Sequence, residues 1–375
     1  MLVNFDNAAT TYPKPKEVRL AVNDAVEMLG GNAGRAGHQL AARTSAAVFS
    51  SRETIAEFFG AEAENVVFTL NCTAALNMAV KGIMHDGGHL IISGMEHNSV
   101  ARPAAALAIE KKIMLSVADV YSNDEMTVDS FRNHIRPDTK AIVCTYASNV
   151  TGQLMPIKKI ADLCKEKGIC FIVDGAQVCG IVDVKLSDGI NILCAAGHKG
   201  LYGVTGTGLL ITDGKYKIHP IIEGGTGSSS TGLKQPDFLP DSLESGTMNV
   251  LGAISLKSGI DFINRIGIER IRRHEERMCD IFINGLKNDK RIKIYRRNEC
   301  EYVPIVSFNI SGVPSEKTAQ LLSEKGFCLR AGFHCAALAH STLGTDNGTV
   351  RFAPSVFSRE KDVIRLVKTI KFMSF

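Results

Sequence analysis

Short apolar runs alternate with amphipathic segments along much of this chain, and this alternation constrains the fold more than any other feature. Most of the runs are continuous stretches of aliphatic residues, which is the pattern of strands buried on both faces. The segments between them repeat their apolar residues at helical spacing. This alternation predicts an α/β fold with a mainly parallel sheet covered by helices. We expect strands at residues 66–69, 90–92, 114–120, 141–146, 169–173 and 190–196.

Polar residues recur just beyond the ends of these expected strands. They are Thr73, His97, Asn149, Asp174 and Lys199. In open α/β sheets ligands bind outside the carboxyl ends of the strands, so these side chains are expected to gather at one edge. The pattern therefore predicts a small-molecule site, and the set is stronger evidence than any one member.

Lys199 follows the apolar run 192–196 after Gly197 and His198, and it precedes a glycine-rich patch at 200–208. A lysine that lies in a glycine-rich turn at the end of a buried strand has a rigid and partly desolvated amine. Desolvation lowers the pKa of a lysine, and a neutral amine attacks carbonyl groups. Lys199 is therefore a candidate Schiff-base lysine. The alternative is an ordinary surface lysine in a turn.

A Schiff-base lysine needs an aldehyde cofactor, and pyridoxal 5′-phosphate (PLP) is the usual one. Asp174 is placed to keep the ring nitrogen of PLP protonated, and His97 offers a flat partner for the ring. Thr73, at an expected helix N-terminus, and His198 are candidate phosphate donors. Taken singly, each residue also has an ordinary structural explanation. Asp174 fits an aspartate in a turn, His97 fits a surface histidine, and Thr73 fits a helix cap.

The charge pattern does not favour a nucleic-acid partner. The chain of 375 residues has 43 Lys and Arg against 39 Asp and Glu, a formal net charge of +4. Its basic cluster at 270–274 lies among glutamates and indicates a solvated helix face.

The ten cysteines include no Cys-x-x-Cys pair, and several lie inside apolar runs, as Cys144, Cys170 and Cys194 do. They are expected to be reduced core residues of a cytoplasmic protein. The first residues lack the basic and apolar regions of a secretory signal. No apolar run approaches the roughly 20 residues that span a bilayer, so no membrane segment is expected.

Several ordered segments together resemble the class V aminotransferase family of PLP enzymes, and most closely its group II cysteine desulfurases and selenocysteine lyases. The segments are 5–11, 96–99, 148–152, 173–177, 197–199, 244–249 and 330–335, with Arg351. The resemblance implies a fold type I PLP-dependent transferase with a mainly parallel seven-stranded sheet and a smaller C-terminal α/β domain. We expect a large PLP-binding domain at 15–255 and a small domain formed by 1–14 and 256–375.

The resemblance also implies cofactor roles. Lys199 would hold PLP covalently, Asp174 would pair with its ring nitrogen, Gln177 would bond the ring oxygen and His97 would stack on the ring. Thr73 and His198 would hold the phosphate.

Other implied roles concern the partner subunit and the substrate. Thr247 would reach the phosphate of a second subunit, which implies a homodimer with shared sites. Arg351 would clamp the substrate carboxylate, with Asn149 close to the substrate and the ring oxygen. His38 and Asn7 would line the pocket.

Cys335 would select the reaction. In the desulfurases the matching cysteine attacks the sulfur of the substrate and becomes a persulfide, and Arg330 and His334 are placed to lower its pKa. A metal site with His334, Cys335 and His340 lacks a closed ligand set, so no metal is expected. A buried structural cysteine is the other alternative.

This sequence departs from the family pattern in three places. Ala196 stands where many members have a Ser or Thr that donates to the phosphate, Phe333 replaces the first histidine of His-His-Cys, and Met248 replaces a proline. The glycine- and serine-rich stretch 224–232 suggests a subgroup other than the housekeeping enzyme of iron–sulfur cluster assembly.

The expected reaction is conversion of L-cysteine to L-alanine, with a persulfide on Cys335 for transfer to an acceptor protein. Three alternatives stay open. They are a selenocysteine lyase acting on L-selenocysteine, an aminotransferase on the same fold, and a non-enzymatic sulfur carrier or structural binding protein that has lost the cofactor.

Overall fold

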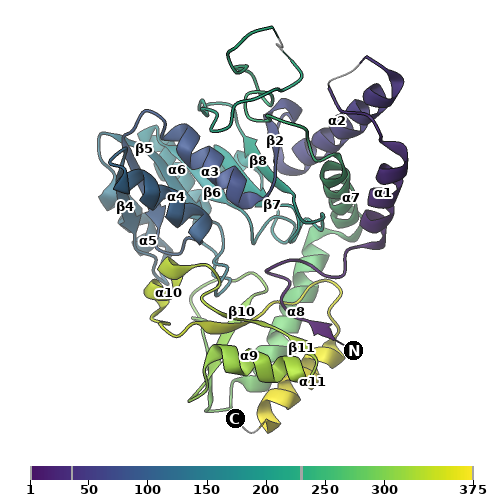
Figure 1. Cartoon of the computed structure of the whole chain (residues 1–375). Coiled ribbons are helices and arrows are strands. Elements are labelled where there is room, and N and C mark those ends of the chain that lie inside the picture. The colour runs from purple at the N-terminus through teal and green to yellow at the C-terminus, as the bar shows by residue number, and fades with distance from the viewer. Residues whose placement is uncertain (1, 35–36, 229–230, 374–375) are drawn as a thin grey trace.

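A seven-stranded sheet forms the centre of the larger part of the molecule (Figure 1). The computed structural model describes residues 2–34, 37–228 and 231–373. The strand order is β2-β8-β7-β6-β5-β3-β4, and only β8 runs antiparallel to its neighbours. The strands are β2 (Val66–Thr69), β3 (His89–Ser93), β4 (Met114–Ala118), β5 (Thr139–Thr145), β6 (Cys170–Asp174), β7 (Ile192–Ala196) and β8 (Gly208–Thr212). The predicted mainly parallel seven-stranded sheet is confirmed.

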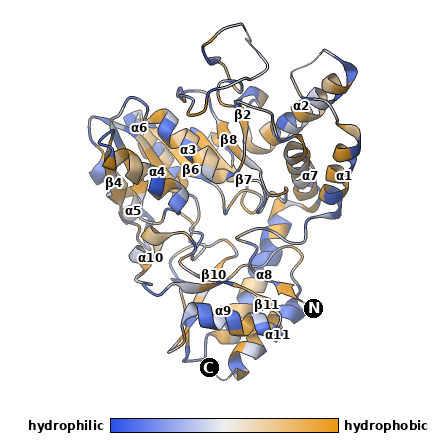
Figure 2. Ribbon diagram, viewed as in Figure 1, coloured by the Kyte–Doolittle hydropathy of each residue, from blue (hydrophilic) through white to orange (hydrophobic). Residues whose placement is uncertain are grey.

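Strand β7 shows why the inner strands are apolar throughout. Its residues alternate between two cores, with Leu193 and Ala195 in one and Ile192, Cys194 and Ala196 in the other. Because successive side chains point to opposite faces, a strand covered on both sides has no polar face. The apolar colouring of the sheet in Figure 2 reflects this burial.

Helices cover both faces of this sheet. Helices α3 and α4 contribute to the core on one face, and α2, α5, α6 and α7 to the core on the other. Helix α1 packs beside α7. The helices are α1 (Lys16–Met28), α2 (Gln39–Phe59), α3 (Cys72–Ile83), α4 (Asn98–Ile109), α5 (Asp124–His134), α6 (Ile157–Lys167) and α7 (Val250–Ile266).

A smaller α/β unit lies below the large sheet in Figure 1. Its four-stranded antiparallel sheet has the order β12-β13-β10-β9, and the N-terminal strand β1 pairs with β11 beside it. Its core is rich in phenylalanine, and the Phe282 and Phe352 rings stack 4.3 Å apart. The elements are β1 (Val3–Asn4), α8 (Ile268–Leu286), β9 (Ile292–Ile294), β10 (Val306–Ile310), α9 (Ser315–Glu324), β11 (Phe327–Cys328), β12 (Arg330–Gly332), α10 (Ala337–Leu343), β13 (Thr349–Phe352) and α11 (Glu360–Phe372).

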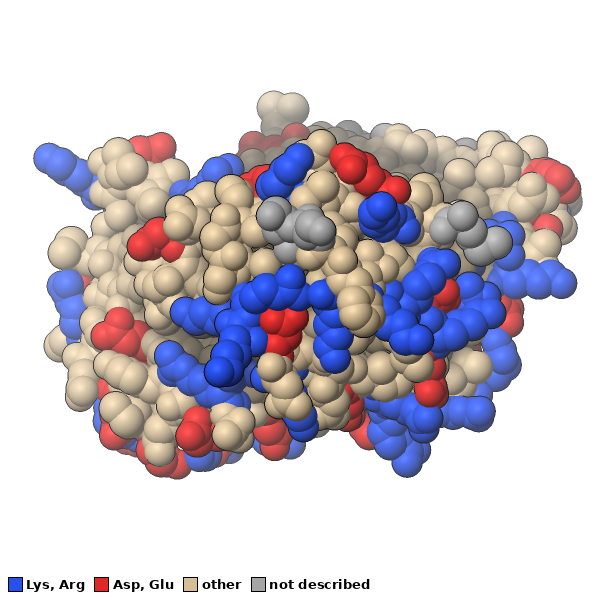
Figure 3. Space-filling view, turned by 90° about the horizontal axis from the view of Figure 1, so that it is seen from below, with Lys and Arg blue, Asp and Glu red and all other residues tan. Residues whose placement is uncertain are grey.

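Acidic and basic side chains intermingle on the lower face of the molecule, where Lys and Arg are prominent (Figure 3). The basic cluster of residues 270–274 lies on α8, and Arg272 pairs with Glu276 one turn later at 2.7 Å. Arg277 pairs with Glu360 at the start of α11. These contacts are those of a solvated helix face.

Differences from the sequence predictions concentrate where the apolar pattern is weak. Strand β8 was not expected, because it opens within the glycine-rich patch that follows Lys199. The predicted domain boundary after residue 255 falls inside α7, which packs on α1 and α2, and the two-domain division stays a prediction. Ser229 and Ser230 of the glycine- and serine-rich stretch lie outside the described residues.

Helices long and apolar enough to cross a bilayer are absent from the described ranges.

The phenylalanine-rich core of the smaller unit predicts that removal of one of its rings lowers the free energy of unfolding strongly. We expect Phe282→Ala to lower the free energy of unfolding by about 3–5 kcal/mol, because a stacked, fully buried ring leaves a cavity. The measurement is urea unfolding. The control is Phe372→Ala, at an 83% exposed position, where a change within about 0.5 kcal/mol is expected. Equal effects of the two variants would contradict this account of the core.

Candidate active site

A cavity of about 220 Å³ lies beyond the carboxyl ends of β5, β6 and β7. Nearly all of the side chains predicted from the strand ends and from the cofactor chemistry meet in it. It is lined by Thr73, His97, Asn149, Asp174, Gln177, His198, Lys199 and Arg351, together with Asn71, Cys72, Ser99, Ala196, Arg330 and His334 among others. The first eight were expected to belong to one site, and the structure brings them together.

The position of Lys199 is fixed by tight packing at the end of β7. A Cβ atom on Gly197 would lie 2.3 Å from the Thr207 hydroxyl oxygen, so only glycine fits between the strand and the lysine. Tyr202 donates its backbone N–H to the Lys199 carbonyl at 2.9 Å, which closes the turn. Burial lowers the pKa of the Lys199 amine, although the Asp174 carboxylate opposes this shift. The predicted desolvated lysine is thus present.

Asp174 ends β6 on the floor of the cavity and is 4% exposed. Its Oδ1 accepts a hydrogen bond from the Ala176 backbone N–H at 2.9 Å, and the Cys72 thiol donates to the same oxygen at 3.6 Å. Among the described residues only Oδ1 of this carboxylate accepts a hydrogen bond. The second oxygen, Oδ2, is thus left for a ligand.

A chain of hydrogen bonds orients His97. Its Nδ1 lies 2.7 Å from the Ser99 hydroxyl, which lies 2.8 Å from the Thr73 hydroxyl at the start of α3. Burial lowers the pKa of His97, so the ring is neutral at neutral pH. Sequence reasoning missed Ser99, although it closes the segment 96–99. Ala196 lines the same wall without a polar atom in its side chain.

Glu96 is fully buried behind His97. Its Oε1 accepts hydrogen bonds from the Ser93 hydroxyl at 2.5 Å and from the Thr145 backbone N–H at 2.7 Å, which ties the ends of β3 and β5 together. Burial raises the pKa of this carboxyl group to about 8. No local pattern around Glu96 indicated this burial.

Arg351 on β13 enters the cavity from the smaller unit and is 1% exposed. Its guanidinium donates to the Asn149 carbonyl and to Asp6 Oδ1, both at 2.9 Å. The Nε atom is buried and has no partner among the described residues. Asp6 was not predicted as a site residue, although it lies in the segment 5–11. The arginine is therefore held rigidly and keeps its Nε–H unpaired.

Cys335 lies on a strained loop at the edge of this site. His334 and Cys335 both have left-handed backbone conformations, with φ of +49° and +57°. The Arg330 guanidinium lies 3.4 Å from the thiol sulfur. Of the ten cysteines, seven are buried, two are half-buried and Cys335 is exposed, which excludes the alternative of a buried structural cysteine.

The positive charge that was expected on His334 beside Cys335 is absent. The ring is buried, and its Nε2 lies 3.0 Å from the carbonyl and the hydroxyl oxygens of Thr349. Burial and the charge of Arg351 lower the pKa of His334 to about 2, so it carries no positive charge. His340 is also buried, with Nδ1 against Thr345. Among the described residues no group of three or more His, Cys, Asp or Glu could hold a metal ion.

Besides Cys335, which lies at its edge, three predicted site residues do not line the cavity. His38 is exposed and caps α2, accepting a hydrogen bond from the Ala41 backbone N–H. Asn7 is buried, and its amide bonds the Ala353 carbonyl and the Tyr12 backbone N–H. Thr247 lines a separate surface cavity of about 460 Å³. Their predicted roles stay predictions.

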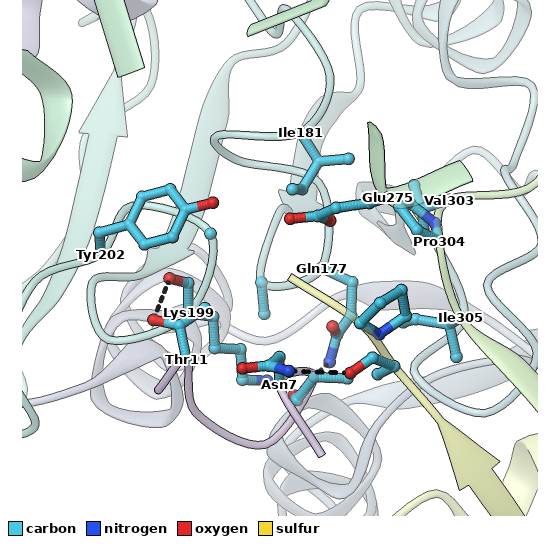
Figure 4. Close-up of a pocket in the computed structure, with 15 residues that line it drawn as sticks. Asn7, Thr11, Gln177, Ile181, Lys199, Tyr202, Glu275, Val303, Pro304 and Ile305 are labelled. Carbon is cyan, nitrogen blue, oxygen red and sulfur yellow. Dashed lines mark hydrogen bonds between the residues drawn. The ribbon is translucent and has the colours of Figure 1, made fainter. Parts of the chain in front are cut away.

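A smaller cavity of about 40 Å³ lies on the other side of Lys199, and Asn7 and Gln177 line it (Figure 4). Tyr202 and Glu275 point toward each other across it. Burial raises the pKa of Glu275 to about 8, partly offset by the Val356 backbone N–H and the Tyr202 hydroxyl. An uncharged acid from α8 therefore lies behind the loop that carries Lys199.

Comparison with known proteins agrees with this geometry. The family model described as aminotransferase class V matches residues 3–366, so the chain belongs to the class V aminotransferase family. That family is PLP-dependent.

Individual relatives carry a narrower name. A probable cysteine desulfurase of Methanothermobacter thermautotrophicus is 30% identical over 97% of this chain and 93% of its own length. The apo structure of a cysteine desulfurase from Thermococcus onnurineus superposes with a TM-score of 0.92 at 29% identity, covering 99% of this chain and 94% of that one. A cysteine desulfurase from Escherichia coli gives a TM-score of 0.88 at 25% identity, with 99% and 94% covered.

The raised pKa of Glu275 predicts a pH-dependent stability. Between about pH 4.5 and pH 8 the carboxyl group ionises in the unfolded chain but stays protonated in the folded one. The wild type should therefore lose stability relative to Glu275→Gln as the pH rises through this window, by up to about 1.4 kcal/mol per pH unit. Urea unfolding at half-unit pH steps measures the difference.

The control is Glu269→Gln on the exposed face of α8, whose stability curve should run parallel to that of the wild type. Parallel curves for Glu275→Gln and the wild type would contradict the uncharged state of Glu275.

Proposed function

We propose that this protein is a PLP-dependent cysteine desulfurase that converts L-cysteine to L-alanine and keeps the sulfur as a persulfide on Cys335. The observation that carries the proposal is the exposed Cys335 thiol beside Arg330, at the edge of a cavity that holds Lys199 and Asp174. The names of the relatives support the same reaction.

The residues of the cavity fit PLP. The Lys199 amine has a lowered pKa, as attack on an aldehyde requires, and Asp174 has an oxygen free for the ring nitrogen. The N-terminus of α3 and the Thr73 and Ser99 hydroxyls offer a phosphate site. His198 Nδ1 is buried and has no partner among the described residues, so it awaits a ligand. When bound, PLP withdraws electrons from the substrate α-carbon.

Substrate binding would depend on Arg351. Its position between Asp6 and the Asn149 carbonyl orients the guanidinium, and the free Nε gives it a donor for the carboxylate of cysteine. His97, neutral and held by Ser99, would cover one face of the cofactor ring. Gln177 lines the same cavity as Asp174 and would bond the ring oxygen.

The proton and sulfur steps would use Lys199 and Cys335. The Lys199 amine takes the proton from the substrate α-carbon, because a neutral amine is a base near pH 7. The Cys335 thiolate attacks the substrate sulfur, so that a sulfur–sulfur bond forms while the carbon–sulfur bond breaks. The β-carbon keeps the bonding electron pair and gains a proton from solvent, the Lys199 ammonium returns the proton to the α-carbon, and the product leaves as alanine. Arg330 would stabilise the thiolate by its charge.

Two alternatives use the same fold. A selenocysteine lyase would release alanine from selenocysteine without needing the thiol of Cys335. An aminotransferase would need a keto-acid acceptor and no cysteine, and the exposed Cys335 beside Arg330 favours the desulfurase.

The proposal includes a homodimer and a sulfur-acceptor protein in the cytoplasm. Thr247 lines the 460 Å³ surface cavity together with the exposed apolar side chains of Phe49, Leu70 and Ile222. A second copy would cover this apolar wall and receive Thr247 at its phosphate site. Ten free thiols support a reducing compartment.

Replacement of Cys335 tests the reaction. We expect Cys335→Ser to release less than about one hundredth of the wild-type sulfide from cysteine, because a hydroxyl cannot accept the sulfur. Alanine and sulfide are measured with cysteine and with selenocysteine as substrates. The control is Cys328→Ser, a half-buried cysteine outside the cavity.

Full activity of Cys335→Ser toward cysteine would contradict the persulfide step. Loss of activity with cysteine but not with selenocysteine would favour the lyase. A purified protein that stays colourless with added PLP would exclude all three enzymes.

Replacement of Arg351 tests carboxylate binding. We expect Arg351→Lys to raise KM for cysteine by about 10- to 100-fold, because lysine loses the hydrogen-bonding geometry that the guanidinium presents. The absorbance of bound PLP should change little. An unchanged KM would show that the carboxylate binds elsewhere. The control is Arg365→Lys on the exposed side of α11.

A further inference from the structure

The N-terminal segment 10–14 lies across the peptide that carries Lys199. The Thr11 backbone N–H and the Thr10 hydroxyl donate to the His198 carbonyl at 3.2 and 3.1 Å. The Thr11 hydroxyl donates to the Lys199 carbonyl at 3.0 Å. Lys199 therefore depends on a segment that is almost two hundred residues away in the sequence.

Lys14 adds the shortest contact of this set. Its ammonium lies 2.7 Å from the His198 carbonyl and 2.7 Å from the Thr11 hydroxyl oxygen. A hydrogen bond from a charged donor is roughly twice as strong as a neutral one, and partial burial strengthens it further. The His198 carbonyl thus has its only cationic donor, among the described residues, in Lys14.

We propose that Lys14 is a positioning residue that holds the His198–Lys199 peptide and thereby aims the Lys199 side chain into the cavity. The inference rests on the proposed function only in the role given to Lys199. The segment that carries Lys14 is anchored at the other end by β1, which pairs with β11 in the smaller unit, and by Asn7, which bonds Ala353. The backbone of the segment that carries Lys14 is therefore held in place by the smaller unit.

The charge of Lys14 is itself sensitive to pH. Burial lowers its pKa to about 8, and no charged neighbour contributes to this shift. The titratable group beside it is His198, whose pKa burial and the charges of Lys199 and Lys14 lower to about 4. His198 therefore stays neutral from pH 6 upward. Above about pH 8 Lys14 loses its proton, and the bond to the carbonyl weakens.

Hydrogen exchange of the full-length protein without PLP tests the inference directly. The Tyr202 and Gly203 amides are the reporters, because they bond the Lys199 and Gly197 carbonyls. We expect Lys14→Met to speed their exchange by about tenfold or more at pH 7, and Lys14→Arg to restore protection. The matched control is Lys16→Met, which removes the same charge two residues away at an exposed position.

The pH profile separates positioning from mere structural support. Protection of the two reporter amides, corrected for intrinsic exchange, should fall between pH 7 and 9 in the wild type and persist in Lys14→Arg. Affinity of each variant for added PLP, measured by absorbance titration, should fall in Lys14→Met and recover in Lys14→Arg.

Exchange in Lys14→Met equal to that in Lys16→Met would overturn the inference, as would a wild-type profile that stays flat to pH 9. The exchange measurement needs neither cofactor nor substrate. Suppose that exchange is rapid in Lys14→Met and that the wild-type protein releases no sulfide from cysteine. This pair of results would support the role of Lys14 and contradict the proposed function.

Discussion

Burial of the central strands on both faces is the constraint on which the rest of the structure depends. Side chains of β5, β6 and β7 face one of two apolar cores, so polar groups fit only where the strands end. The three strands are parallel, and their ends lie at the same edge of the sheet. Asp174 and Lys199 meet there, and the chemistry of the site follows from where the apolar runs stop.

Desolvation is the common cause of the unusual charge states around this edge. It lowers the pKa of Lys199 and raises the pKa of the buried acids Glu96 and Glu275 to about 8. It also keeps His97 and His334 neutral. The region around the cavity therefore carries fewer charges than its composition implies, and a ligand would meet mainly the Asp174 carboxylate and the guanidinium groups of Arg330 and Arg351.

The cavity is assembled from both parts of the molecule. The large sheet contributes Lys199 and Asp174, and the smaller unit contributes Arg351 and the loop of Cys335. The N-terminal segment connects them, since β1 pairs in the smaller unit while residues 10–14 bond the peptide of Lys199. A movement of the smaller unit would therefore change the position of Lys199 as well as that of Arg351.

The sequence by itself determined most of the sheet, the edge at which the site lies and the placement of Lys199 and Asp174 at that edge, because these depend on local apolar patterns and strand ends. Strand β8 was not predicted, because it begins at the end of a glycine-rich patch that interrupts the apolar pattern. Only the tertiary structure decided that His334 turns to Thr349, that Asp6 holds Arg351, and that His38 caps a helix outside the cavity. Side-chain direction and burial depend on contacts between residues far apart in the chain, and no local pattern encodes them.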